Sequence, residues 1–257
     1  MFGDCGPEAP EGIFEGVEYL DATRYPGTEC DVLIVSRSPT AVDDAFGVKA
    51  KVRLLWVHDV NAGPELDQKR ALRFDRILAL SEWHRDFLRQ CYPQMDPGLI
   101  HVTRNGIAPE RFEGDDPRNP AKVIYSSSPD RGLHCLLELW PTVLKAIPEA
   151  ELHVFYGAKN LEILIQATGD AAISSMHRRT LHMANSMPSV KMRGRVGQAE
   201  LAKEMLSAGV WLLPGGFCET SCIGAAEAQA AGCHVVASAN AALLETVGPR
   251  GSLIGGF

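Results

Sequence analysis

The chain has 257 residues, a hydrophobic content of 46% and a formal net charge of −7. This length allows one large domain or two modest ones, and the apolar content is sufficient for packed cores. The acidic balance, without a basic stripe, excludes the electrostatic footprint of a nucleic-acid-binding protein. No run of 18 apolar residues occurs and the first residues do not have the pattern of a signal peptide, so we expect a soluble, cytoplasmic protein.

Seven cysteines are scattered along the chain, and their odd number fits reduced cytosolic thiols better than a disulfide framework. Cys218 and Cys222 are not backed by a second pair of ligands, so we interpret them as packing residues. The histidines at positions 134, 153, 177 and 182 also have no metal-ligand spacing. We therefore predict no structural metal.

Short apolar runs alternate with helical patterns through the first half of the chain. Their continuous hydrophobicity favours parallel strands that are covered on both faces. The expected strands are Cys30–Ser36, Val52–Asp59, Arg76–Ser81 and Leu99–Gly106, with helical patterns at Gly63–Phe74 and after a capping Ser81, and an Asn105–Gly106 turn at the end. Residues 1–29 carry little pattern. The first half is therefore expected to form a doubly wound α/β domain.

A second alternating series follows Ala108–Ala121, a stretch rich in proline and acidic residues that we interpret as an interdomain linker. Its expected strands are Lys122–Ser127, Glu151–Gly157, Ser189–Gly194, Val210–Pro214 and Cys233–Ser238, with helices at Leu133–Ile147, within 158–186, at Gln198–Gly209 and in the final NAALLETVG segment, before a last strand at SLIGG. Pro141 should kink the first of these helices. The fold class is α/β with two Rossmann-like domains, which we place at residues 1–112 and 113–257.

The stretch PGGFCETSCIGAAEAQAAG, Pro214–Gly232, connects two of these strands. It reads as a glycine-rich loop followed by a helix of small residues, which we expect to open at the N-cap pair Thr220–Ser221 and to stop at Gly232. In a βαβ unit the N-terminus of such a helix faces outward at the carboxyl end of the sheet. Its free N–H groups and dipole favour an anion there.

Glu219 lies at the mouth of this helix and Glu227 lies inside it, eight positions further on. At helical rise this separation is about 12 Å. Carboxylates accept hydrogen bonds from sugar hydroxyls, so the arrangement suits a diphosphate with a sugar at each end, which describes a nucleotide-sugar. The spacing alone is equally compatible with two solvated glutamates.

The segment ETSCIGAAE, Glu219 to Glu227, resembles the E-x7-E motif of retaining GT-B glycosyltransferases, glycosyltransferase family 4 in particular. Three further segments, SEWHRDFL, VTRNGIAPERF and SSSPDRGLHCLLELWPTVLKAIPEAELHVFYG, are similar to that family in order and spacing. The resemblance covers approximately Val52–Gly255. It implies a GT-B architecture, with an acceptor-side N-terminal domain and a donor-binding C-terminal domain. Compared with the family, the chain looks shortened at both ends, because residues 1–40 do not match the family's Gly-rich loop and its closing helices do not follow Phe257.

The resemblance also assigns roles within the motif. Glu219 would contact the hydroxyls of the donor sugar, and Glu227 would hold the ribose diol. The backbone N–H groups of Thr220, Ser221 and Cys222 would meet the distal phosphate.

Arg131 stands where the family carries a lysine that neutralises the diphosphate, and arginine can do this bidentately. The family's second cation falls at Ser126 here. Arg193 or Arg195 could compensate for it. Because KMRGRVG resembles the base-binding loop, Arg195 and Val196 could instead lie along the nucleobase, and both interpretations stay open.

His58 ends a strand in the sequence WVHD. The family's matching histidine lies over the donor sugar near the leaving phosphate, whereas a histidine at a strand end is equally often a hydrogen-bonded core residue. Asp59 could orient the ring. The catalytic candidates are therefore His58, Arg131 and Glu219.

The resemblance implies a retaining, metal-independent hexosyltransferase without a cofactor, which takes a nucleotide-diphosphate sugar as donor and a glycan, lipid-linked or small-molecule hydroxyl as acceptor. Two alternatives are an inactive nucleotide-sugar-binding module and a GT-B-type nucleotide-sugar epimerase. Nucleic acid is not an expected partner. A peripheral membrane contact and a homo-oligomer both remain open.

Overall fold

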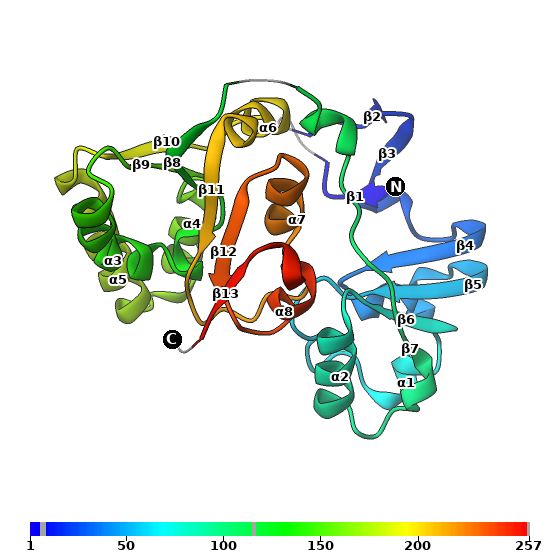
Figure 1. Ribbon diagram of the computed structural model, residues 1–257. Coiled ribbons are helices and arrows are strands. Elements are labelled where there is room, and N and C mark those ends of the chain that lie inside the picture. The colour runs from blue at the N-terminus through cyan, green and yellow to red at the C-terminus, as the bar shows by residue number, and fades with distance from the viewer. Residues whose placement is uncertain (6–8, 115–116, 256–257) are drawn as a thin grey trace. The chain divides into compact units, whose positions relative to one another are not determined.

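The computed structural model describes residues 1–5, 9–114 and 117–255 and contains two compact units, Met1–Arg104 and Asn105–Phe257 (Figure 1). Each unit is α/β and has a hydrophobic core of its own. Residues 105–112, which we placed in the first domain, belong to the second unit: the 3-10 turn Pro109–Phe112 packs against its helices, and Phe112 joins its core. Of the expected linker, Asp115 and Asp116 lie outside the described residues.

The first unit contains a four-stranded parallel sheet in sequential order. Ser81 caps the second helix as predicted, because its hydroxyl accepts the N–H of His84 at 3.0 Å. The elements are β4 (Glu29–Ser36), β5 (Lys49–Trp56), α1 (Gln68–Ala71), β6 (Arg76–Ala79), α2 (Glu82–Cys91) and β7 (Ile100–Val102). The four strands are confirmed, but the helix expected over 63–74 shrinks to one turn. Residues 103–108 form neither strand nor turn, so the Asn105–Gly106 turn was wrong.

One face of this sheet is not covered, contrary to our expectation. Val32 and Ile34 on β4 are 52% and 54% exposed, and Val52, paired with Val32, is also exposed. Right-handed connections between strands in sequential order all lie on the same side of a sheet. Among the described residues of this unit, no helix therefore covers the opposite side.

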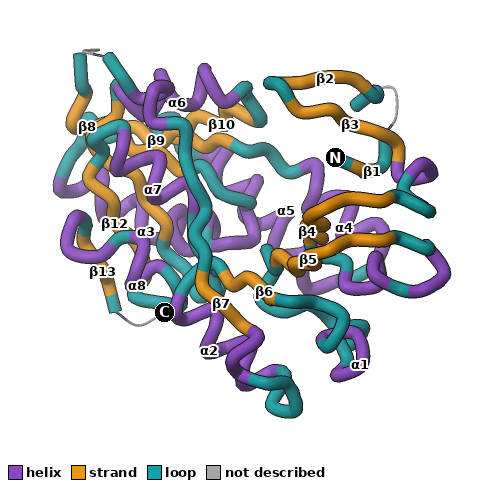
Figure 2. The backbone as a smooth tube through the Cα atoms, turned by 90° about the vertical axis from the view of Figure 1, so that its right-hand side faces the viewer, coloured by secondary structure: helices purple, strands orange, loops and turns teal. Residues whose placement is uncertain are grey.

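Residues 1–29 are more ordered than their composition indicated. They contain β1 (Phe2–Gly3), β2 (Gly12–Phe14) and β3 (Val17–Asp21), in the order β1-β3-β2. Figure 2 shows β2 and β3 side by side as a hairpin. The rings of Phe14 and Tyr19 pack edge to face across it at 5.7 Å, a cross-strand contact that the surrounding glycines and acidic residues obscured.

The second unit contains a six-stranded parallel sheet in the order β10-β9-β8-β11-β12-β13. Its strands are β8 (Asn119–Tyr125), β9 (Glu151–Phe155), β10 (Val190–Gly194), β11 (Ala208–Leu213), β12 (His234–Ser238) and β13 (Ser252–Ile254). Its helices are α3 (Leu133–Ala146), α4 (Lys159–Thr168), α5 (Ala171–Ser186), α6 (Gln198–Leu206), α7 (Ile223–Ala230) and α8 (Leu243–Thr246). These elements confirm the Rossmann-like domain predicted for this half.

Helices cover both faces of this sheet. α3 and α5 pack together on one side, while the turn Pro109–Phe112 lies against both α6 and α7. Leu133, Leu136, Leu137 and Trp140 of α3 are buried, whereas Ile147 just after the helix is exposed. The indole N–H of Trp140 donates to the Ser189 hydroxyl at 2.9 Å. Within the described parts of the chain, no helix has both the length and the apolarity needed to cross a membrane.

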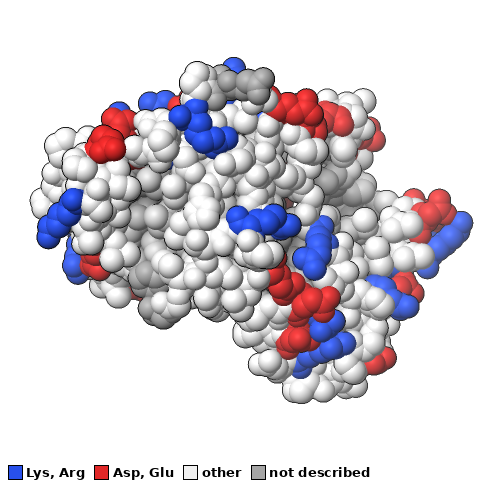
Figure 3. Space-filling model, in the orientation of Figure 1, with Lys and Arg blue, Asp and Glu red and all other residues white. Residues whose placement is uncertain are grey.

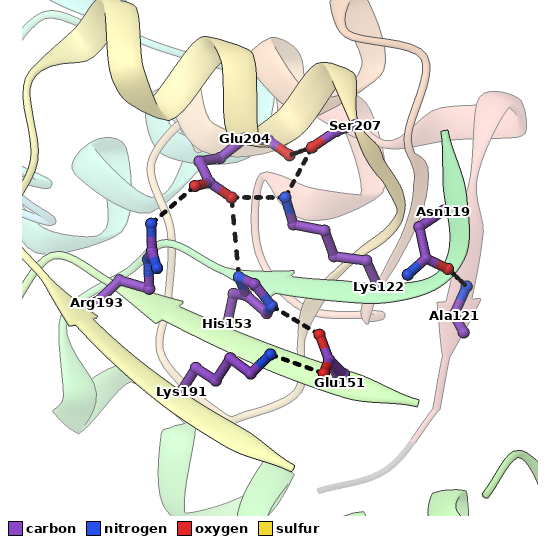
Figure 4. Close-up of polar contacts among 9 residues, drawn as sticks. All are labelled: Asn119, Ala121, Lys122, Glu151, His153, Lys191, Arg193, Glu204 and Ser207. Atoms are coloured by element: carbon purple, nitrogen blue, oxygen red, sulfur yellow. Dashed lines mark hydrogen bonds and ion pairs between the residues drawn. The ribbon is translucent and has the colours of Figure 1, made fainter. Parts of the chain in front are cut away.

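A network of charged side chains fixes α6 to the sheet (Figure 4). Lys122 of β8 donates to Glu204 at 2.5 Å and to the hydroxyl of Ser207 at 2.7 Å. Glu204 also pairs with Arg193 of β10 at 3.0 Å. His153 of β9 lies 3.8 Å from the same carboxylate, so one glutamate connects three neighbouring strands.

Candidate functional site

The strand order of the second unit reverses between β8 and β11, which are hydrogen-bonded neighbours. β9 and β10 follow on one side, and β12 and β13 on the other. In open α/β sheets, ligands bind outside the carboxyl ends of the strands at such a switch point. The loops that leave there are residues 126–132 and residues 214–222.

The two loops touch through their backbones. Gly132 has φ = 122°, and a Cβ placed on it would lie 1.7 Å from the carbonyl oxygen of Pro214. A Cβ on Gly215 would lie 2.8 Å from the carbonyl oxygen of Arg131. Only glycine permits this approach at either position. The contact fixes Arg131 beside the loop that leads to Glu219.

Arg131 and Glu219, both predicted from the sequence, are brought together by this contact. Nη1 of Arg131 donates to Oε1 of Glu219 at 3.1 Å. The guanidinium carbon lies 4.2 Å from the ring centroid of Phe217, a cation–π distance. The arginine is thus held between a carboxylate and an aromatic ring.

Glu219 is buried, and burial raises the pKa of its carboxyl. The charge of Arg131 and the hydrogen bond from it act in the opposite direction, while Asp130 adds a smaller rise. Its backbone is fixed at both ends, since its N–H donates to the Phe217 carbonyl at 3.1 Å and its carbonyl accepts from Ala242 at 3.1 Å. The backbone of Glu219 is thus held in place, and the charge of Arg131 favours the ionised form of its carboxyl group.

Helix α7 begins at Ile223, so its N-cap lies one residue after the expected N-cap pair Thr220–Ser221. Its N-cap is Cys222, which has φ = 61° and makes no side-chain capping bond. The shift has a tertiary cause, because the Thr246 hydroxyl of α8 donates to the carbonyl of Ser221 and draws that residue out of the helix. The N–H groups of the first turn therefore start about one residue later than predicted.

The position expected to carry a second cation is occupied by a structural contact. The hydroxyl of Ser126 accepts the indole N–H of Trp211 at 2.8 Å. Arg193 pairs with Glu204 under α6, two strands away from β8. Arg195 is exposed beyond the end of β10, and Val196 packs on the core. The structure does not bring Arg193 to the Arg131–Glu219 pair.

Glu227 is half-buried on α7. Burial raises the pKa of its carboxyl, and Arg111 of the turn Pro109–Phe112 lowers it. Arg111 was missed in the sequence because it falls in the stretch assigned to the linker. It is a cation of the same unit whose charge acts on the second motif glutamate.

His58 belongs to the first unit, two residues after β5 ends at Trp56. Its ring lies 4.6 Å from the Trp56 ring, centroid to centroid. Burial lowers the pKa of His58, as does the charge of Arg37, while Asp59 opposes both. Asp59 forms an ion pair with Arg37, a neighbour that sequence reasoning did not identify.

Two further residues at the site were missed. Asn240, after β12, donates from its side-chain amide to the carbonyls of Gly216 and Phe217 at 3.0 and 3.2 Å. Phe217 supports Arg131 through its ring. The available signals were an aromatic side chain two residues before the glutamate and an asparagine just after a buried strand.

The fold and the site define a class: a Rossmann-like unit whose switch point combines an arginine, a buried glutamate and a helix N-terminus. No family model and no curated protein match the sequence, but solved structures share its fold. Anabaena HepE in complex with UDP and glucose has a TM-score of 0.64 at 16% identity, covering 88% of this chain and 64% of its own. Sucrose-phosphate synthase from Thermosynechococcus elongatus has a TM-score of 0.63 at 19% identity, with coverages of 87% and 60%.

A third structure, a glycosyltransferase from Rickettsia africae, has a TM-score of 0.62 at 12% identity, with coverages of 85% and 60%. The chain therefore has the GT-B glycosyltransferase fold, with two Rossmann-like units. It spans less than two thirds of the length of these three proteins.

Proposed function

We propose that this protein is a nucleotide-sugar-dependent glycosyltransferase that transfers a hexose to an acceptor hydroxyl with retention of configuration. The observation that carries the proposal is the Arg131–Glu219 pair at the switch point of a GT-B fold. The UDP and glucose bound to HepE support it by analogy. The acceptor class is a glycan, a lipid-linked sugar or a small molecule.

In this mechanism the protein acts by electrostatic stabilisation. Arg131 and the first-turn N–H groups of α7 stabilise the departing diphosphate as the glycosidic bond breaks. Glu219 accepts hydrogen bonds from hydroxyls of the donor sugar, and Glu227 accepts them from the ribose diol. The acceptor hydroxyl attacks on the face that the leaving group vacates, and its proton passes to the departing diphosphate oxygen. No divalent metal and no cofactor form part of this proposal.

The remaining predicted residues have supporting roles in the proposal. Arg195 and Val196 line the nucleobase. Arg193 acts only indirectly, through its pair with Glu204. His58 keeps the role near the donor sugar that the resemblance implies for it, and burial lowers the pKa of its ring.

The test combines binding and turnover. Calorimetry with UDP-, GDP- and ADP-sugars identifies the donor, and Glu219→Ala and Arg131→Ala should each reduce transfer by about 10²-fold or more while the fold is retained. The matched control is the exposed pair formed by Arg179 and Glu138 at 2.8 Å, whose alanine variants should transfer normally. Wild-type turnover in both site variants would remove this pair from the mechanism.

A second candidate is a nucleotide-sugar-binding module without transfer activity. The observation in its favour is Ser126, whose hydroxyl is bonded to Trp211 where the resemblance places a second diphosphate cation. Tight binding without transfer or donor hydrolysis would establish this alternative. Appearance of a new sugar nucleotide without acceptor would indicate an epimerase instead.

A further inference from the structure

Phe217 is a large aromatic side chain at the surface of the candidate site. It is 37% exposed although it lies in the loop between β11 and α7, where burial would be the favourable state for a phenyl ring. One face of the ring meets the guanidinium of Arg131 at 4.2 Å. The exposed Phe217 ring therefore packs against Arg131, the residue that we propose binds the diphosphate.

The backbone beneath the ring is held from three directions. The carbonyl of Phe217 accepts from the Asn240 side chain and from the Glu219 N–H. The N–H of Gly215 donates to the Ser238 hydroxyl at 2.8 Å. The ring is thus mounted on a loop that the end of β12 fixes in place.

Arg131 needs such support. A free arginine side chain populates many rotamers, and the hydrogen bond from Nη1 to Glu219 restrains the guanidinium at one of its nitrogens. A ring against the flat face of the guanidinium removes that freedom without occupying its N–H donors. The loop 126–132 contains no other arginine or lysine. If Arg131 were misplaced, no second cation in this loop could neutralise the diphosphate.

We infer that Phe217 is a positioning residue, which holds the guanidinium of Arg131 with its donors directed toward the diphosphate of the donor. The ring does not touch the reacting atoms and acts through the arginine. The inference rests on the proposed function and adds a residue outside the E-x7-E pair to it.

The test compares three variants by calorimetry with UDP and with UDP-glucose. Phe217→Leu keeps an apolar side chain and removes the aromatic face, so both ligands should bind about three- to tenfold more weakly. Phe217→Tyr restores the ring and should restore wild-type affinity. In an Arg131→Met background, Phe217→Leu should cause no additional loss, because the ring then has no cation to hold.

Leu139→Ala serves as the control, since Leu139 is an apolar side chain of α3 with similar exposure, 43%. It should leave both affinities unchanged. NMR spectroscopy of the ligand-free protein gives a second measurement. The ring current of Phe217 should shift the Arg131 Nε–H resonance, and Phe217→Leu should abolish that shift.

The outcomes separate the two claims. If the wild type binds neither ligand, nor the GDP or ADP counterparts, the proposed function fails and the inference with it. If the wild type binds and Phe217→Leu binds equally tightly, or loses affinity to the same extent with and without Arg131, only the positioning role is overturned.

Discussion

Glu219 has a carboxyl group on which burial and Arg131 act in opposite directions. Burial raises its pKa, and the arginine lowers it. As the pH falls toward the raised pKa, the carboxylate takes up a proton and can no longer pair with Arg131 or serve as a purely accepting group for sugar hydroxyls. Affinity for UDP-glucose should therefore decline on acidification at a pH above the ordinary glutamate value of about 4.3.

Calorimetric titrations of UDP-glucose and UDP between pH 4.5 and 8 would measure this dependence. The decline should be steeper for UDP-glucose than for UDP, because Glu219 is assigned to the sugar. Arg131→Met should move the acid limb to higher pH, since the main opposing influence on the Glu219 pKa is gone. Equal profiles for the two ligands would contradict this assignment of Glu219.

Gly132 offers a prediction about stability at the same site. A Cβ at this position would lie 1.7 Å from the Pro214 carbonyl oxygen, and the backbone has φ = 122°. Gly132→Ala should therefore destabilise the protein by about 2–4 kcal/mol, since two backbone segments must separate to admit a methyl group. Urea unfolding measures the loss. Gly106→Ala, at a position with an unremarkable φ and no atom within 4 Å, should stay within about 0.5 kcal/mol of wild type.

At the scale of elements, α6 is fixed by a charge network rather than by apolar packing alone. Lys122 is buried and Glu204 is largely so, and they meet at 2.5 Å (Figure 4). Removing one partner of a buried pair leaves the other charge without compensation. Lys122→Met should therefore cost about 2–4 kcal/mol in the free energy of unfolding.

The control for this prediction is an ion pair on the rim of the same network. Lys191 and Glu151 lie 2.7 Å apart, and their side chains are 43% and 40% exposed. Lys191→Met should change the free energy of unfolding by less than about 1 kcal/mol, because exposed pairs are screened by water. Equal losses in the two variants, measured by chemical unfolding at pH 7, would show that the network does not depend on burial.

The elements that the sequence predicted well are those set by local pattern. The stripe Leu133, Leu136, Leu137 and Trp140 gives α3, and the hydroxyl of Ser81 gives the start of α2. The start of α7 could not be predicted in the same way. Thr220–Ser221 is a good local cap, but a hydrogen bond from Thr246, 25 residues away, moves the cap to Cys222. Local propensity is a weak prior where a tertiary contact competes with it.

The candidate site likewise contains residues that a local motif identifies and residues that only tertiary contacts bring together. Glu219 and Glu227 stand in one short motif, and a resemblance could identify them. The support for Arg131 comes from Phe217 and Glu219, 86 and 88 positions further along the chain, and Glu204 meets Lys122 across 82 positions. Contacts at such separations are fixed by the strand order, which periodicity does not reveal.

At the scale of the whole molecule, charge and apolar surface are distributed differently. In Figure 3, acidic and basic side chains are interspersed and no single sign dominates the face in view. Exposed apolar side chains occur in both units, but in the first unit Val32, Ile34 and Val52 share one sheet face that no described helix of the unit covers. Parallel sheets are normally covered on both faces. The first unit is thus the less self-sufficient of the two.

The second unit, by contrast, has what an independent domain needs. Residues 105–257 contain their own core and a six-stranded sheet with helices on both faces. They also contain each proposed donor-binding residue except His58. We therefore expect residues 105–257 produced alone to unfold cooperatively on heating and to bind UDP within about tenfold of the full chain, because the diphosphate contacts are all internal to this unit.

Circular dichroism melts and calorimetry on residues 105–257 and on residues 1–104 would test this division. The first unit alone should melt at lower temperature or aggregate, since its exposed valine and isoleucine side chains form an apolar patch. Arg131→Ala in the isolated second unit provides the control for specific binding and should remove most UDP affinity. A folded second unit that fails to bind UDP, while the full chain binds it, would show that nucleotide recognition requires residues of the first unit.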